Sequence, residues 1–460
     1  MFLIDTSDPD LVGRSTPDPL RYAFSRKKGA HAGGRMDVIE PNQVQSRLKD
    51  ALKLSNTQTH PRTTNGRCLY IHIPFCRVRC TYCNFFQYAS SKQLMNRYFE
   101  ALVKEIQWKS SFDWSQSAPF QAVYVGGGTP TDLSSQQLKE LGQLLRSSFP
   151  LTSDCEITLE GRVNRFNDEK FEAALEGGFN RFSFGVQSFD NTVRLAAKRL
   201  DKRDYVMERL QSMVSYNAAP IVIDLLYGLP HQTLDNWQED LESYLESGVD
   251  GVDLYQLIEM KGLPMELMVN QGRLPMPADT AMKASMFQMG VEFMAKHHQR
   301  RLSVNHWASG NRERSIYNSL AKTTAEVLPL GAGAGGSVNG VATMQLRDMD
   351  QYIKAIEDQR FPVAGAMNVS PNAAIESVIK SHFDRGVLSK ANLDSVANFP
   401  LFDALIPLFK AWQKNGLVEV NQQYVELSLA GQFWSTTLAQ NTIQVIRPLF
   451  NQSQSNTNVA

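Results

Sequence analysis

The sequence lacks three features that would narrow its class: an excess of charge, a long apolar run and a basic leader segment. Its 460 residues carry 47 Lys and Arg against 47 Asp and Glu, so no global electrostatic field attracts nucleic acid or an anionic membrane. No stretch approaches the roughly 18 apolar residues of a membrane span, and the start, MFLIDTSDPDLVG, has acidic residues where a signal peptide needs basic ones. We therefore expect a cytoplasmic protein that binds neither nucleic acid nor membrane.

Cysteines are also few, but three of them are clustered. Five is an odd number, and in a reducing compartment such a cluster favours metal or redox chemistry over disulfides. Cys76, Cys80 and Cys83 stand in CRVRCTYC at the spacing C-x3-C-x2-C. A cubane iron–sulfur cluster held by three thiolates leaves one iron able to accept an outside ligand. Zinc is the alternative metal, because His72 could add a nitrogen to the three sulfurs, and a reactive disulfide is a further alternative.

From residue 67 onward, short β-rich runs alternate with amphipathic segments. The predicted strands are CLYIHIP, QAVYVGGG, CEITLEG, RFSFGVQSF, IVIDLLYGLP and VDLYQLIEM. Strands that alternate with helices indicate parallel βαβ units, which form either a barrel or an open doubly wound sheet.

The position of the polar and glycine residues distinguishes these two folds. Each predicted strand in turn carries one such group at or near its carboxyl end. In chain order these groups are the cysteine loop, Gly126 to Gly128, Glu160, Gln187, Asp224, and Gln256 with Glu259. In a barrel the carboxyl ends of the strands converge on one mouth, whereas in an open sheet they lie along an edge. A single site that draws on six strands predicts an α/β fold with a partial (β/α)6-type barrel.

Three other regions surround this barrel, which is expected over residues 67–345 with a substrate-side extension. Residues 1–66 lack sustained periodicity and predict an irregular N-terminal arm with one or two helical turns. Residues 346–450 predict a small, mostly helical, winged-helix-like C-terminal module that ends in a hairpin. Residues 451–460 are polar and predict a disordered tail.

The combination of motifs resembles the radical S-adenosylmethionine (SAM) enzymes, specifically the oxygen-independent coproporphyrinogen dehydrogenase superfamily. The similarity is carried by YIHIPFCRVRCTYC, GGGTP, GVQSF, DLLYGLP and LGAGAGG, and covers residues 67 to 445. It implies that Cys76, Cys80 and Cys83 hold a 4Fe–4S cluster and that SAM fills the open iron site. An electron from the cluster then cleaves SAM to methionine and a 5′-deoxyadenosyl radical.

The same resemblance implies a set of SAM-binding residues. They are Tyr70, Gly126, Gly127, Gly128, Thr129, Glu160, Gln187, Arg199 and Asp224. Glycines let backbone carbonyls approach an ammonium group, carboxylates and an amide accept from ribose hydroxyls, and Arg199 can bind a carboxylate. The alternatives are a simple tight turn for the glycines and a solvated helix charge for Arg199. After Glu160, EGRVNRF departs from the family's usual acidic-plus-proline turn.

LGAGAGG contains G-x-G-x-x-G and could also indicate a dinucleotide site. No convincing helix pattern follows it, as such a site requires. The resemblance instead implies a loop that borders the substrate side of the barrel.

Two departures favour one branch of the superfamily. The dehydrogenase typically has a further cysteine two residues after the third cluster cysteine, where this chain has Phe85. Three segments resemble the anaerobic haem-utilisation radical SAM proteins of the anaerobilin synthase type: the arm segment DPLRYAFSRKKGAHAGGR, EGR and VNHWASGNRERS.

This resemblance implies a radical SAM methyltransferase that opens the haem macrocycle to a linear tetrapyrrole and releases iron. It further implies two SAM molecules per turnover and flavodoxin or another low-potential electron donor. Coproporphyrinogen oxidative decarboxylation and a haem chaperone without turnover remain as alternatives.

Haem carries two propionates, and the arm holds a local basic cluster in a chain of zero net charge. We expect the arm to fold over the barrel mouth and bind them, the alternative being a solvated basic loop. The cluster comprises Arg21, Arg26, Lys27, Lys28 and Arg35. Eight methionines between Met260 and Met294 suit either a wall against the macrocycle or core packing.

Two histidines are candidate contacts to haem iron or propionate. His306 follows a predicted strand, and His31 lies in the arm. A lone histidine is more often structural, so this is the alternative for both.

Overall fold

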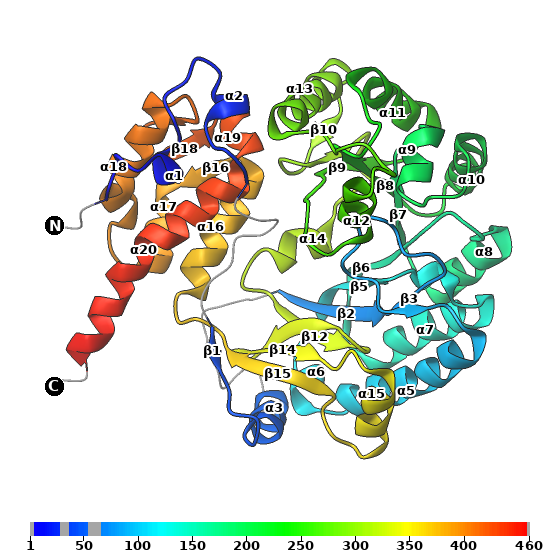
Figure 1. Cartoon of the computed structure of the whole chain (residues 1–460). Coiled ribbons are helices and arrows are strands. Elements are labelled where there is room, and N and C mark those ends of the chain that lie inside the picture. The colour runs from blue at the N-terminus through cyan, green and yellow to red at the C-terminus, as the bar shows by residue number, and fades with distance from the viewer. Residues whose placement is uncertain (1–3, 28–35, 54–65, 458–460) are drawn as a thin grey trace.

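The large sheet has the parallel core that the strand pattern predicts. In the computed structural model, which describes residues 4–27, 36–53 and 66–457, the six predicted strands lie side by side in chain order (Figure 1). They are β2 (Arg67–Ile73), β5 (Phe120–Gly127), β6 (Leu151–Gly161), β7 (Arg181–Gln187), β8 (Ile221–Tyr227) and β9 (Gly251–Gln256). All neighbouring pairs are parallel. The α/β fold and the partial barrel are therefore confirmed.

Helices cover the outer face of this sheet (Figure 1). Local signals set their ends: Ser134 and Gln137 form a capping box at the start of α7, and Gly248 ends α11 in the left-handed conformation. The longer helices are α5 (Lys92–Ser110), α7 (Ser135–Ser148), α8 (Asp168–Gly177), α10 (Arg203–Ser215), α11 (Leu234–Ser247) and α13 (Thr280–Lys296). The shorter ones are α6 (Asp113–Gln116), η1 (Pro130–Asp132), α9 (Asn191–Ala196), α12 (Pro264–Asn270), α14 (Ile316–Ala321) and α15 (Met349–Glu357). Among the helices of the described residues, none has both the length and the apolar character needed to cross a membrane.

The parallel strands are buried on both faces, which explains their nearly continuous apolar runs. In β8, for example, Ile221, Ile223 and Leu225 are completely buried, and so is Val222 between them. Asp224 is the one ionisable carboxylate in this strand. Asp224 is half-buried at the centre of the strand, and because a carboxylate inside an apolar run is costly to bury, its presence indicates a functional role.

The sheet extends beyond the parallel core at both edges. On one side, β12 (Glu326–Leu330) lies parallel to β2 and is followed by antiparallel β13 (Gly335–Val338), β14 (Val341–Gln345) and β15 (Val363–Asn368). On the other side, β11 (His306–Ala308) pairs with β9 and with β10 (Arg300–Arg301). The sheet therefore continues past residue 345, where we expected the barrel unit to end.

The C-terminal module begins with α16 and combines helices with a small antiparallel sheet of order β16-β18-β17 (Figure 1). Its elements are α16 (Ala373–Arg385), β16 (Val387–Ser389), α17 (Lys390–Ala397), α18 (Leu401–Lys414), β17 (Val418–Val420), β18 (Tyr424–Leu427), α19 (Leu429–Phe433) and α20 (Ser435–Thr457). Helix α20 continues into the segment 451–460, where the composition predicts disorder.

The N-terminal arm contains the two expected helical turns, α1 (Pro9–Val12) and α2 (Pro19–Tyr22). It also contains a ten-residue helix, α3 (Val44–Lys53), and the strand β1 (Asp37–Val38), which pairs with β15. The indole nitrogen of Trp412 donates to the carbonyl of Leu11 at 3.0 Å, and that of Trp434 donates to Leu20 at 3.1 Å. The arm is therefore packed against the C-terminal module rather than irregular throughout.

Candidate functional site

The cysteine loop starts where β2 ends. Strand β3 (Phe75–Cys76) pairs with β4 (Tyr88–Ala89) and brackets the loop. Cys76 and Cys80 are buried, Cys83 is half-buried, and all three are free thiols. The loop thus presents three unpaired sulfurs beside the carboxyl ends of the parallel strands.

Each of the three sulfurs accepts a hydrogen bond from a different donor. The hydroxyl of Thr129 donates to Cys76 Sγ at 3.3 Å, and the backbone N–H of Phe85 donates to Cys83 Sγ at 3.3 Å. Arg162 Nη2 donates to Cys80 Sγ at 3.1 Å. These donors suit thiolates, the form in which cysteine binds metals.

Positive charge reinforces the thiolate form at Cys80. Burial alone would raise the pKa of this thiol, but the guanidinium groups of Arg199 and Arg162 lower it below its ordinary value. Arg199 is one of the predicted SAM-binding residues, whereas Arg162 was not predicted. A basic residue in the unusual EGR turn was the signal that could have indicated it.

The structure argues against zinc, the alternative metal. His72 Nδ1 lies 2.9 Å from the hydroxyl of Tyr70, and Nε2 lies 3.1 Å from Gln87 Nε2, so neither ring nitrogen faces the cysteines. Within the described ranges, no group of three His, Cys, Asp or Glu side chains could hold a single metal ion. In a cubane cluster each thiolate binds a different iron, so the three cysteines fit the cluster better than one ion.

The glycine run after β5 is packed too tightly for side chains. A Cβ on Gly127 would lie 2.6 Å from the His72 ring, and one on Gly128 would lie 2.5 Å from the carbonyl oxygen of Phe75. Gly127 also has a φ of 111°, which L-residues rarely adopt. The run therefore brings β5 against the start of the cysteine loop, as a ligand cradle or as packing.

Two half-buried carboxylates lie on other strands of the parallel core, Glu160 on β6 and Asp224 on β8. The backbone N–H of Gly127 donates to Glu160 at 3.4 Å. Burial raises the pKa of Glu160 to about 7, although this hydrogen bond, Tyr124 and Arg199 lower it. Burial, together with the negative charges of Asp253 and Glu160, also raises the pKa of Asp224 well above its ordinary value.

Arg199 and Gln187 complete the group. Arg199 donates from Nη1 to the carbonyl of Gly185 at 2.9 Å and from Nη2 to the hydroxyl of Tyr82 at 3.1 Å. Its Nε and the side-chain oxygen of Gln256 are buried and have no partner within the described structure. Gln187 has a φ of 74°, uncommon for a residue other than glycine. Unpartnered buried polar atoms at a strand-end cradle fit a polar ligand such as SAM.

Tyr70 belongs to an aromatic stack that sequence reasoning missed. Its ring centroid lies 6.4 Å from that of Tyr124 and 6.3 Å from that of Tyr317, and the latter two lie 4.7 Å apart. Tyr317 comes from α14, far along the chain, and no local pattern relates it to β2 or β5. The three rings form an aromatic wall beside Glu160.

His306 does not occupy the position expected of a haem contact. It is 3% exposed, its Nδ1 lies 2.8 Å from Asp253, and its Nε2 lies 3.3 Å from Glu313. Burial would lower its pKa, but the two carboxylates raise it to about 9. Arg181 pairs with the same Glu313 at 3.0 Å. His306 is therefore an internal cation of the barrel without a free nitrogen for iron.

The basic residues of the arm separate into different environments. Arg21 binds α13 through Ser285 at 3.0 Å and Gln288 at 3.2 Å, so its guanidinium docks the arm instead of facing a substrate. Arg26 is exposed. Lys27 lies over the ring of Phe433 at 4.1 Å, and burial and the nearby Lys283 lower its pKa to about 7. The predicted contacts Lys28, His31 and Arg35 lie outside the described residues.

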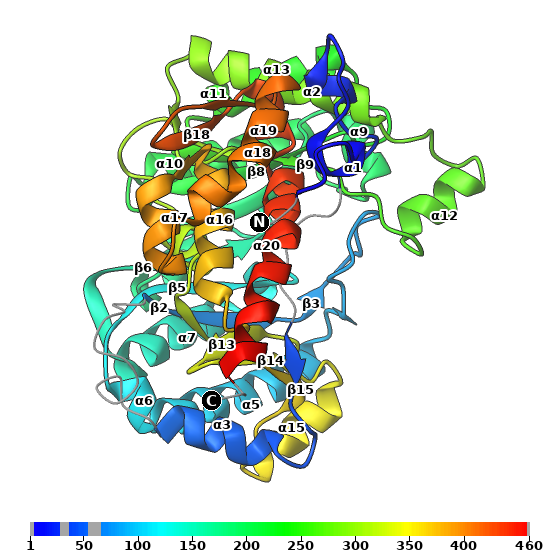
Figure 2. The same cartoon turned by 90° about the vertical axis from the view of Figure 1, so that its left-hand side faces the viewer.

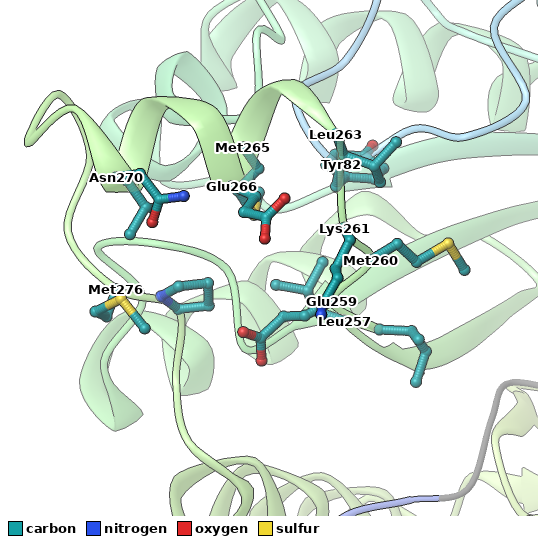
Figure 3. Close-up of a pocket in the computed structure, with 13 residues that line it drawn as sticks. Tyr82, Leu257, Glu259, Met260, Lys261, Leu263, Met265, Glu266, Asn270 and Met276 are labelled. Atoms are coloured by element: carbon teal, nitrogen blue, oxygen red, sulfur yellow. The ribbon is translucent and has the colours of Figure 1, made fainter.

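A pocket of about 230 Å³ adjoins the cysteine loop (Figure 3). It lies beneath α12, the helix that projects from the body of the molecule in Figure 2. The backbone N–H of Met265 in α12 donates to the carbonyl of Thr81 at 2.8 Å, which ties the helix to the loop. Residues that line it include Tyr82, Leu257, Met260, Leu263, Met265 and Met276. Three of the eight methionines therefore line a cavity, whereas Met286 and Met294 are core residues.

Comparisons with known proteins identify the family of this chain. The family model described as "Radical SAM superfamily" matches residues 70–244. The chain is 35% identical to an anaerobilin synthase from Escherichia coli O157:H7 over 398 residues, which is 86% of this chain and 87% of that protein. It is 29% identical to a heme chaperone, HemW, from Bacillus subtilis (strain 168), over 67% of this chain and 80% of that protein.

Among solved structures, coproporphyrinogen III oxidase (HemN) from Escherichia coli has the same fold. The two superpose with a TM-score of 0.74 at 20% identity, over 91% of this chain and 96% of the other. The cysteine loop, the strand-end cradle and these similarities lead to one conclusion: the chain belongs to the radical SAM superfamily, in the group of proteins that resemble oxygen-independent coproporphyrinogen III oxidase.

Proposed function

We propose that this protein degrades haem anaerobically, as a radical SAM methyltransferase that opens the macrocycle to a linear tetrapyrrole and releases iron. The observation that carries the proposal is the 35% identity to an anaerobilin synthase, because it extends over 87% of that protein. Phe85, where the dehydrogenase typically has another cysteine, supports the same choice. Similarity to a heme chaperone and to coproporphyrinogen III oxidase leaves two other outcomes to be tested.

The proposed cofactors are a 4Fe–4S cluster on Cys76, Cys80 and Cys83, and SAM. Together they supply a carbon radical when an electron reaches the cluster. The chain's own residues provide the surroundings. Glycines 126–128 leave room for backbone contact, and the unpartnered Nε of Arg199 offers a charged donor for a carboxylate. Two SAM molecules per turnover and a flavodoxin-like electron donor complete the proposal.

We further propose that the pocket beneath α12 contributes to haem binding. Its methionines and Tyr82 present polarisable, apolar surface to a flat ring (Figure 3). Glu259 lines the same pocket and pairs with Lys283 at 2.7 Å, and Lys283 lies close to Lys27 of the arm. Lys283 is buried and paired, so Lys27, whose ammonium group is protonated below about pH 7, is the lysine that would suit a propionate of haem.

An anaerobic assay tests the proposal. Reconstituted protein is mixed with haem, SAM and a low-potential reductant, and we expect loss of the haem Soret band together with formation of S-adenosylhomocysteine. Cys80→Ser, which removes a cluster thiolate, is the inactive control. Haem that binds without turnover would indicate a chaperone instead. Decarboxylation of coproporphyrinogen III, with haem left intact, would indicate the oxidase.

A further inference from the structure

Arg162 differs in charge from Thr129 and Phe85, which also donate to cysteine sulfurs, and it shares Cys80 with Arg199 and Tyr82. Thr129 and the backbone of Phe85 are neutral, whereas Arg162 carries a full charge to Cys80 at 3.1 Å. The same Nη2 atom donates to the carbonyl of Val78 at 3.1 Å. Within the described structure its guanidinium contacts a sulfur and a carbonyl instead of a carboxylate, so no ion pair neutralises it.

The backbone around Arg162 is built to hold this side chain in place. The N–H of Arg162 donates to the hydroxyl of Thr131 at 3.1 Å, and that hydroxyl contacts the carbonyl of Arg162 at 3.1 Å. A Cβ on Gly161 would collide with Thr131, so glycine is required for the approach. The EGR turn thus anchors its arginine to the segment that follows the glycine cradle.

We propose that Arg162 raises the reduction potential of the iron–sulfur cluster through its hydrogen bond to Cys80. Reduction adds negative charge that spreads onto the cysteine sulfurs, and a charged donor stabilises that charge more than a neutral one. The contact is partly buried, so solvent screens it incompletely. A higher potential lets a weaker electron donor reduce the cluster. The inference rests on the cluster assignment made under the proposed function.

Redox titration of the reconstituted protein, followed by the electron paramagnetic resonance signal of the reduced cluster, tests the inference without substrate turnover. We expect Arg162→Gln and Arg162→Met to shift the midpoint potential to more negative values, with Arg162→Lys between them and the wild type. Arg77→Gln is the matched control. Arg77 lies in the cysteine loop, but it pairs with Asp132 at 2.8 Å and contacts no sulfur within the described structure, so the potential of this variant should stay at the wild-type value.

The outcomes separate this inference from the proposed function. A wild-type potential in all Arg162 variants would overturn it, and so would an equal shift in Arg77→Gln, because general charge would then explain the effect. Loss of iron from every Arg162 variant would also overturn it, in favour of a purely structural contact. If the wild-type protein itself took up no cluster, the cluster assignment and the proposed function would fail instead.

Discussion

At the scale of single residues, the site is a set of buried charges that the folded protein perturbs. Glu160 is the clearest case, because its carboxylate is enclosed near Tyr124 and Gly127, and burial raises its pKa to about 7. The folded state therefore holds a proton that the unfolded state releases above about pH 4.5. The contribution of the Glu160 carboxyl to the free energy of unfolding is therefore present below about pH 4.5 and is lost as the pH rises through about 7.

Replacing this carboxyl should therefore change stability in a pH-dependent way. The free energy of unfolding of Glu160→Gln, relative to that of the wild type, should be higher at pH 8 than at pH 5. We expect this difference between the two pH values to reach up to about 3 kcal/mol. Thermal unfolding of both proteins without cofactors at the two pH values measures this difference. Asp168→Asn, at an exposed carboxyl of α8, is the control. An equal difference between Glu160→Gln and the wild type at both pH values would contradict the prediction.

Lys27 gives a second residue-scale prediction, for haem binding. We expect Lys27→Ala to weaken haem affinity about tenfold, because one charge-assisted hydrogen bond to a propionate is lost. Spectrophotometric titration of haem into the variant and the wild type measures the change. Arg26→Ala removes an exposed charge one residue away. The same loss of affinity in both variants would indicate a general attraction by the arm and would contradict a specific contact of Lys27.

At the scale of elements, the end of β5 shows how close packing builds the cradle. Gly127 has a positive φ, and a Cβ added to it would lie only 2.6 Å from the ring of His72. We expect Gly127→Ala to destabilise the protein by about 1–3 kcal/mol, since backbone strain and a clash add. The melting temperature measures the effect.

A glycine in open surroundings provides the matched control for this substitution. Gly365 in β15 has no positive φ, and a Cβ there meets nothing within 4 Å. Gly365→Ala should leave the melting temperature nearly unchanged. A similar loss in the two variants would show that the surroundings of Gly127 are not special.

The elements also show what sequence can predict. The six parallel strands were predictable because strands buried on both faces leave long apolar runs, and the strand-end residues were predictable because each interrupts such a run. Tyr317 and Glu313 were not predictable, and only the basic residue in the unusual EGR turn pointed to Arg162. Their roles depend on contacts with β2, β7 and the cysteine loop, which lie far away in the chain, and no local periodicity encodes these contacts.

At the scale of the whole molecule, the arm joins parts that are distant in sequence. It contacts α13 through Arg21 and the C-terminal module through Trp412 and Trp434. The charges of the arm suit haem and led us to expect it at the barrel mouth. The position of the arm instead follows from its apolar residues, because Leu11 and Leu20 are buried.

The tryptophan contacts predict how firmly the arm is held. We expect the double variant Trp412→Phe, Trp434→Phe to release the arm more often, because each indole N–H that bonds an arm carbonyl contributes about 1 kcal/mol. Limited proteolysis within residues 4–27, followed by mass spectrometry, should be faster than in the wild type.

The control for this variant separates the hydrogen bonds from the lost ring volume. Trp114 is completely buried, and its indole nitrogen has no partner within the described structure. Trp114→Phe therefore shrinks one buried indole ring without removing a hydrogen bond. Cleavage of the arm at the same rate in this control and in the double variant would show that the bonds do not hold it.

The pairing of β1 with β15 has a consequence for solubility. Asp37 and Val38 form β1, the outermost strand of the large sheet, and the backbone N–H of Ile39 donates to the carbonyl of Ala366 at 2.9 Å. These residues occupy backbone groups that would otherwise form an open edge, the kind of surface through which proteins aggregate. A chain shortened by its first 53 residues would therefore expose a new adhesive edge and be prone to self-association, even with every cysteine of the site in place.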